Sequence, residues 1–141
     1  LQATMSPLPI TAAARPLDDS MSPVQLYLGL RGRIDRRGFW LYGVLALLAA
    51  GMVLMALLEI AGLHPERAER IANLVIAWPA IAVSVKRWHD RDKPGWWVLI
   101  TLVPLIGQLW ALIDNGFLRG TRGPNRFGPE PARPVALSTR Q

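Results

Sequence analysis

Residues 39–62 read FWLYGVLALLAAGMVLMALLEIAG and carry one charge, Glu59, close to their far end. As an α-helix this segment spans about 36 Å, which exceeds the roughly 30 Å hydrocarbon core of a bilayer. It is too long for the apolar region of a signal peptide, and no cleavage pattern ends it. The segment therefore predicts an uncleaved transmembrane helix.

Two further apolar segments follow, IANLVIAWPAIAVSV at 71–85 and GWWVLITLVPLIGQLWALI at 95–113. Pro65 suits the first turn of a helix, so the second helix is expected over 65–87. The third is expected over 94–114, with Asp92 as its N-cap. This third segment is too short to cross a bilayer twice as α-helix, so the sequence argues against a re-entrant hairpin.

The fold class predicted from these segments is an all-α membrane protein. It is a bundle of three transmembrane helices at about 39–62, 65–87 and 94–114, with disordered or irregular N- and C-terminal tails. Residues 1–23 form a disordered N-terminal extension, 24–131 the membrane domain, and 132–141 a disordered tail.

The formal net charge is +6, and the basic residues flank the apolar segments or lie in the tail. Arg31 and Arg33 would also suit nucleic acid, but a nucleic-acid-binding protein needs no lipid-compatible segments. We therefore expect membrane-flanking cations and no nucleic-acid partner. The chain has no cysteine, which excludes disulfides and thiolate chemistry. No ionisable residue lies at mid-membrane, which disfavours a transporter.

Residues 86–97 read KRWHDRDKPGWW, a charged and aromatic stretch between the second and third segments. His89 beside Asp90 would suit proton transfer, and Asp90 with Asp92 would suit a hard cation. The alternative is that His89 and Asp90 cap helix ends and pair with arginines. A catalytic dyad needs a third partner that the sequence does not show. We therefore predict no catalytic residue, no metal and no cofactor.

The basic and aromatic residues around this stretch are instead candidates for binding lipid or a partner protein. Each basic residue near an anionic surface contributes about 1 kcal/mol. Two crossings separate 31–37 from 86–93, so both blocks are expected on one membrane face, where Asp35 and Asp90 could pair with arginines of the other block. The candidates are Arg31, Arg33, Arg36, Arg37, Lys86, Arg87, His89, Asp90, Arg91, Lys93, Trp96 and Trp97.

Small residues recur on one face of each predicted helix, where they would let membrane helices approach closely. The predicted helix-packing residues are Gly43, Ala46, Ala50, Ala77, Ala80, Ser84, Gly107 and Ala111.

Three blocks of the chain resemble the DUF805 family of small bacterial inner-membrane proteins. LRGRIDRRGFW at 30–40 is similar to that family's entry to its first helix, and the RWHD and GWW groups within 79–97 are similar to its R-L-H-D and S-G-W-W. GTRGPNRFGPEP at 120–131 is similar to its C-terminal G-x-x-G-x-N-x-[FY]-G-x-D-P. Single departures occur at Gly38, Trp88, Pro94 and Glu130.

The resemblance implies a multi-pass protein of the bacterial inner (plasma) membrane and implies no reaction. The sequence favours a non-enzymatic component that binds membrane lipids, anionic ones above all, or a partner membrane protein or second copy of itself. The alternative is a small membrane enzyme acting on lipid headgroups through His89, Asp90 and Asp92. Four arginines precede the first segment and two follow it, which predicts a cytoplasmic N-terminus, and three crossings then put the C-terminal tail outside.

Overall fold

The computed structural model describes residues 21–131, which are helical with no strand among them. The tail predictions for 1–20 and 132–141 lie outside this range. The elements are α1 (Pro23–Tyr27), α2 (Arg36–Gly38), the π-helix η1 (Phe39–Leu45), α3 (Ala46–Ile60), α4 (Pro65–Asp90), the 3-10 helix η2 (Gly95–Leu102) and α5 (Ile106–Gly116).

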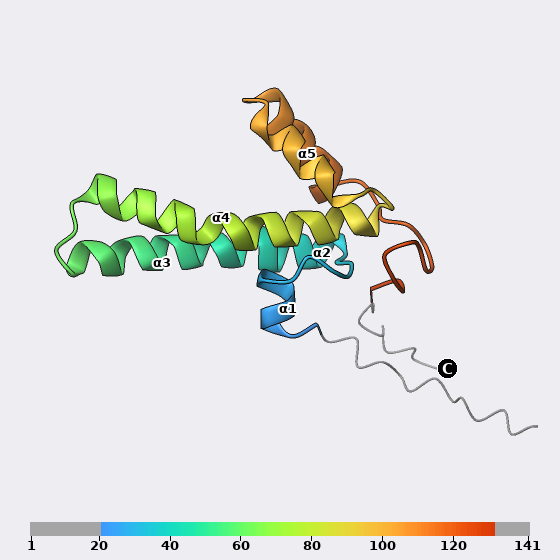
Figure 1. The fold of residues 1–141 in the computed structure, drawn as a ribbon, viewed down its shortest axis with the longest axis horizontal. Helices are drawn as coiled ribbons and strands as arrows, with labels where there is room; N and C mark the ends of the chain where they lie inside the picture. Colours follow the sequence, from blue (N-terminus) through green and yellow to red (C-terminus); the bar gives the residue numbers. More distant parts are fainter. Residues whose placement is uncertain (1–20, 132–141) are drawn as a thin grey trace, which may run out of the picture.

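The body of the protein is a long helical hairpin. α2, η1 and α3 follow one another as a single rod that lies antiparallel to α4 (Figure 1). The turn between them uses Gly62 at a φ of +94°, and Pro65 opens α4 at a position where its missing N–H is not needed. Both rods, Arg36–Ile60 and Pro65–Asp90, are long and apolar enough to cross a membrane. Their apolar side chains are largely exposed, whereas the core helix of a soluble protein would bury them.

The two rods pack tightly where η1 meets α4. A Cβ on Gly43 would lie 2.7 Å from a methyl carbon of Val83, so only glycine fits this contact. Towards the turn, α4 contributes the buried Ala68 and Ala72, and Gly51 of α3 faces Ile76.

Gly43, one of the predicted packing residues, lies at this contact. Among the other predicted residues of the two rods, Ala46, Ala80 and Ser84 are half-buried, whereas Ala50 and Ala77 are exposed. Bonding from i to i+5 in η1 widens the turn, so the α-helical spacing i, i+3, i+7 does not hold through 39–45.

The third apolar segment is not one helix. η2 and α5 meet at residues 103–105, where Val103 is extended before Pro104 and Leu105 has a φ of +61°. The chain then turns back on itself. Gly107 packs so tightly on the Ile100 carbonyl that a Cβ there would collide with it. α5 with η2 projects away from the paired rods in Figure 1.

The two ends of this segment meet, because Lys93 Nζ lies 3.0 Å from a carboxylate oxygen of Asp114. The prediction of a continuous helix over 94–114 was wrong, because η2 and α5 form two arms that fold back on each other. Each arm is about 16 Å long, roughly half the hydrocarbon thickness. Neither arm is long enough to cross the hydrocarbon core by itself.

α1 packs against the end of the rods where α2 begins. Its Leu26 forms a small core with Ile34, Phe39 and Val83. The Tyr27 hydroxyl donates a 3.0 Å hydrogen bond to the Tyr42 carbonyl, and burial raises the pKa of this hydroxyl. α1 begins at Pro23, the last residue of the predicted disordered extension.

Replacing Gly43 by leucine should lower the stability of the folded protein. The new side chain would need space that Val83 occupies, and such overpacking costs about 1–3 kcal/mol. Thermal unfolding of the purified protein in mild detergent should show a lower midpoint for Gly43→Leu. Ala50→Leu, at an exposed position of the same rod, serves as the matched control and should leave the midpoint unchanged. Equal midpoints for the two variants would contradict this packing.

Candidate functional site

Three stretches far apart in the sequence meet at the end of the rods where α4 stops. Arg33 precedes α2, Asp90 ends α4, and residues 120–131 follow α5. Arg33 and Asp90 are 57 residues apart in sequence, yet Arg33 Nη2 lies 2.9 Å from Asp90 Oδ1. The predictions that the two basic blocks share one end, and that Asp90 pairs with an arginine of the first block, are confirmed.

Asp90 lies between two buried guanidinium groups. Arg33 donates twice to Oδ1, at 3.1 and 2.9 Å, and Arg87 Nη1 lies 2.5 Å from Oδ2. The three residues are 4%, 6% and 0% exposed for Asp90, Arg33 and Arg87. Charges this deeply buried are tolerated only when paired and hydrogen-bonded. The carboxylate therefore makes the burial of both arginines possible.

The C-terminal loop 120–128 wraps around this cluster. Arg33 Nη1 donates to the carbonyls of Gly123 and Gly128 at 2.8 and 3.1 Å, and Nη2 donates to the Thr121 carbonyl at 2.7 Å. Gly123 and Gly128 have positive φ, and a Cβ on Gly120 would collide with the Asp90 carboxylate. The glycines thus allow the loop to follow the surface of the ion cluster closely.

His89 and Asn125 fasten the same loop. The Asn125 amide donates to the His89 carbonyl at 2.8 Å, and the Phe127 ring stacks on the His89 imidazole with centroids 4.0 Å apart. His89 Nδ1 lies 3.2 Å from the Gly32 carbonyl. These contacts give His89 a structural role between the loop before α2 and the loop after α5.

The end of α5 is held by side chains from the other helices. The final carbonyls of a helix have no partner within it, and cations there also face the negative end of the helix dipole. Here the carbonyls of residues 114–118 accept in turn from Arg91, Arg87, Trp40, Arg36 and again Arg87. This set of bonds fixes the returning arm of the hairpin to the rods.

Asp114 gives the hairpin its second attachment. Its buried carboxylate accepts from Trp88 Nε1 at 3.1 Å and from Lys93 Nζ at 3.0 Å, and Arg91 also pairs with it at 3.0 Å. Asp114 was not among the residues predicted from sequence. The available signal was its position as the single acidic residue at the end of an apolar segment. Lys86 is fully buried and donates to the carbonyls of Leu26, Gly29 and Ala82, which attaches α1.

The predicted binding residues therefore separate into two groups. Arg33, Lys86, Arg87, His89 and Asp90 are buried and bonded within the protein, so they hold this end together. The others are exposed or half-buried at its surface: Arg31, Arg36, Arg37, Arg91, Lys93, Trp96 and Trp97.

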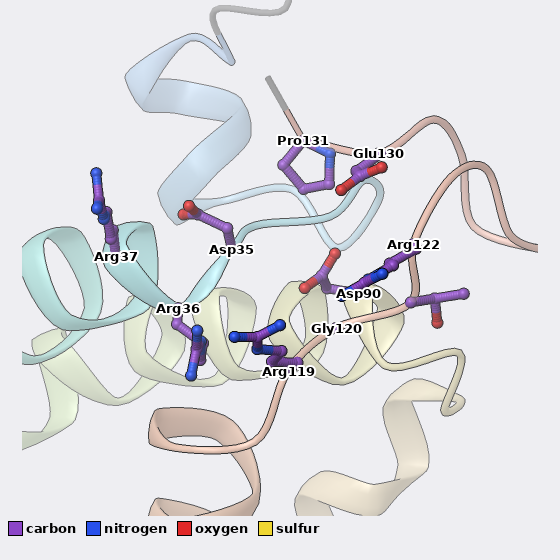
Figure 2. Close-up of a pocket in the computed structure, with 10 residues that line it drawn as sticks. Asp35, Arg36, Arg37, Asp90, Arg119, Gly120, Arg122, Glu130 and Pro131 are labelled. Atoms are coloured by element: carbon purple, nitrogen blue, oxygen red, sulfur yellow. The ribbon is translucent and has the colours of Figure 1, made fainter. Parts of the chain in front are cut away.

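A hollow of about 430 Å³ opens beside the buried cluster (Figure 2). Arginines contribute most of its charge, and two of them, Arg119 and Arg122, were missing from the sequence-based candidates because they were placed on the other side of the membrane. Among residues 21–131, Arg37, Arg119 and Arg122 have no hydrogen bond or ion pair. The lining residues are Asp35, Arg36, Arg37, Asp90, Arg119, Gly120, Thr121, Arg122, Glu130 and Pro131.

The third acidic candidate, Asp92, pairs with Arg126 at 3.1 Å on the surface. Within the described part of the chain, no group of three histidine, aspartate or glutamate residues could hold a metal ion. His89, Asp90 and Asp92 thus all have protein partners, and the geometry offers them no shared substrate position.

Two exposed apolar rods that are long enough to cross a bilayer define a helical membrane protein. The chain belongs to the DUF805 family, a family of proteins of unknown function whose model matches residues 27–129. It is 34% identical over 119 residues to the inner membrane protein YhaH of Escherichia coli K12, covering 82% of this chain and 97% of that protein. It is 31% identical over 111 residues to the inner membrane protein YhaI of the same strain, covering 79% and 92%. No solved structure matches the chain.

Neutralising Asp90 should destabilise the fold strongly. Asp90→Asn leaves two buried guanidinium groups without a counter-charge, and breaking such a cluster costs about 3–5 kcal/mol. The matched control is Asp92→Asn, two residues further along the chain. It removes the same charge from the exposed pair of Asp92 with Arg126 and should cost at most about 1 kcal/mol. Thermal unfolding midpoints in detergent compare the two. Similar midpoints for both variants would show that the ion pairs of Asp90 with Arg33 and Arg87 do not stabilise the fold.

Proposed function

We propose that this chain is a non-enzymatic integral protein of the bacterial plasma membrane whose basic, aromatic cytoplasmic face binds anionic lipid headgroups. One observation carries the proposal: at this end of the molecule the acidic groups are bonded within the protein, whereas Arg37, Arg119 and Arg122 have no partner among the described residues. An unpaired excess of guanidinium groups at the end of two apolar rods suits an anionic membrane surface.

Aromatic residues beside the arginines support the same placement. Trp96 is 63% exposed and stacks on Trp97 with ring centroids 5.4 Å apart. The Lys93 ammonium lies 4.6 Å from the Trp97 ring centroid. Tryptophan next to lysine or arginine is characteristic of the level at which lipid headgroups meet hydrocarbon.

The proposed topology is multi-pass, with two spans, α2–η1–α3 and α4, followed by the half-depth hairpin of η2 and α5. It replaces the three-span bundle predicted from sequence. Both chain ends of the described region then lie on one side of the membrane, because the hairpin returns to the end of α4.

This topology gives a strong charge asymmetry. On the side opposite the basic face, the only lysine or arginine residues among the described residues are Arg67 and Arg70. The basic face carries all the others, which places it in the cytoplasm by the positive-inside rule. These are Arg31, Arg33, Arg36, Arg37, Lys86, Arg87, Arg91, Lys93, Arg119, Arg122 and Arg126.

The alternative of a headgroup-directed enzyme has less support. It needs a free acid or base within reach of a substrate. His89 is stacked and bonded, Asp90 is held between two arginines, and Asp92 pairs with Arg126.

Single cysteines in this cysteine-free chain should report the topology. In intact cells, a membrane-impermeant maleimide should label Leu63→Cys, in the turn between the spans. It should label Pro124→Cys, after the hairpin, only when the cells are opened. Leu63→Cys is the positive control for labelling from outside. Labelling of Pro124→Cys in intact cells would mean that the third segment crosses the membrane.

Lipid binding should be visible by native mass spectrometry of the full chain released from mild detergent. With equal phosphatidylglycerol and phosphatidylcholine present, the retained lipid should be mainly phosphatidylglycerol. Arg31→Gln with Arg37→Gln should lower this preference severalfold, because two exposed cations are lost. The matched control, Arg67→Gln with Arg70→Gln, removes two charges at the opposite end and should leave it unchanged. Conversion of a lipid headgroup by the purified protein would contradict a non-enzymatic role.

A further inference from the structure

We propose that the hollow beside the Asp90 cluster binds one phosphomonoester group, carried on the headgroup of a membrane phospholipid. This inference rests on the proposed function and narrows it to a lipid class: those whose phosphate is esterified once, so that three of its oxygens are free to accept hydrogen bonds.

The position of the hollow favours a lipid phosphate. Arg36 begins one candidate span and Asp90 ends the other, and both residues line the hollow. The opening is therefore at the depth where lipid phosphates lie, just outside the hydrocarbon. Its volume of about 430 Å³ accommodates a small headgroup, not only an ion.

The carboxylates of the lining are already engaged. Asp35 Oδ1 accepts from the Gly38 amide at 2.7 Å, as the N-cap of α2, and Glu130 Oε2 accepts from the Gly123 amide at 2.8 Å. Asp90 is paired with Arg33 and Arg87. These groups shape the wall of the hollow. Asp90 adds little net negative charge to it, whereas the carboxylates of Asp35 and Glu130 offset two of its four arginines and leave a positive excess.

Most guanidinium groups of the lining have no bonding partner in the described part of the chain, in contrast to the carboxylates. Arg37, Arg119 and Arg122 have no partner within the described residues, and Arg36 donates only to the Phe117 carbonyl. Figure 2 shows the Arg36 and Arg119 side chains next to one another in that view, and the hollow lies between the start of α2 and the loop after α5. Like charges around one hollow repel each other, and an anion between them removes that repulsion.

The number of arginines favours a phosphomonoester over a diester. A guanidinium donates two parallel hydrogen bonds to a pair of phosphate oxygens. A phosphodiester offers two free oxygens and one charge, whereas a phosphomonoester offers three and about −1.5 to −2 charges at pH 7. The four arginines that line the hollow match the phosphomonoester better. Thr121, also in the lining, adds a hydroxyl that can donate to the same group.

The test measures the thermal unfolding midpoint of the full chain in mild detergent with added lipid. The probes are short-chain phosphatidic acid, phosphatidylglycerol, cardiolipin, phosphatidylcholine and inorganic phosphate. Phosphatidic acid should raise the midpoint at concentrations at least tenfold lower than phosphatidylglycerol or cardiolipin. Phosphatidylcholine and inorganic phosphate should have no effect at the same concentrations.

Two double variants identify the site. Arg119→Gln with Arg122→Gln should abolish the advantage of phosphatidic acid, and Arg119→Lys with Arg122→Lys should reduce it because the paired donors are lost while the charge remains. The matched control is Arg67→Gln with Arg70→Gln, which removes two arginines from a second hollow at the turn between the spans. That control should bind phosphatidic acid like the unmodified protein.

Three results would overturn the inference. Equal responses to phosphatidic acid and phosphatidylglycerol would remove the monoester preference while leaving the broader lipid-binding function in place. An unchanged preference in both Arg119 and Arg122 double variants would place the site elsewhere. A response to inorganic phosphate alone would point to a soluble ligand. Failure of every anionic lipid to bind would instead reject the proposed function itself.

Discussion

The ion pair of Asp90 with Arg33 and Arg87 is the constraint on which this end of the molecule depends. Each guanidinium is charged and buried, so neither could remain buried there at low cost without the carboxylate between them. Arg33 brings the segment before α2, and Arg87 reaches the carbonyls at the end of α5. Arg33 also gathers the C-terminal loop through three carbonyls. One carboxylate thereby sets the positions of three segments and of the hollow that they border.

The three blocks that resemble the DUF805 family, at 30–40, 79–97 and 120–131, meet at this ion cluster. Arg87 donates from two nitrogens of one planar group to the carbonyls of residues 115 and 118 while pairing with Asp90. A lysine ammonium at this position could not span those partners. The same side chain therefore has two roles. Arg87 belongs to the basic residues that favour the proposed orientation, and it also bonds the last carbonyls of α5.

The long rods and the shared basic end could be predicted because apolar length and the number of crossings determine them. The hairpin could not, because counting residues assumed an α-helix throughout 94–114. Only the structure shows that the chain reverses, through the extended Val103 before Pro104 and the close approach of Gly107 to Ile100. Treating that segment as one crossing put residues 120–131 at the end opposite the basic blocks, whereas the structure places them against Arg33 and Asp90. Arg119 and Arg122 were consequently read as external tail charges, and the hollow they line was missed.

The turn at 61–64 has a consequence for how the protein meets its surroundings. It is short, is held by Gly62, and joins two rods that begin and end at the opposite face. With the basic end in the cytoplasm, the described chain offers the far side of the membrane little more than these four residues and the first turn of α4. A protease, an antibody or a soluble partner in that compartment would therefore reach very little of the described chain. Under the proposed topology, the described chain can be contacted from that compartment only at this turn and the first turn of α4, and otherwise from the cytoplasm or within the membrane.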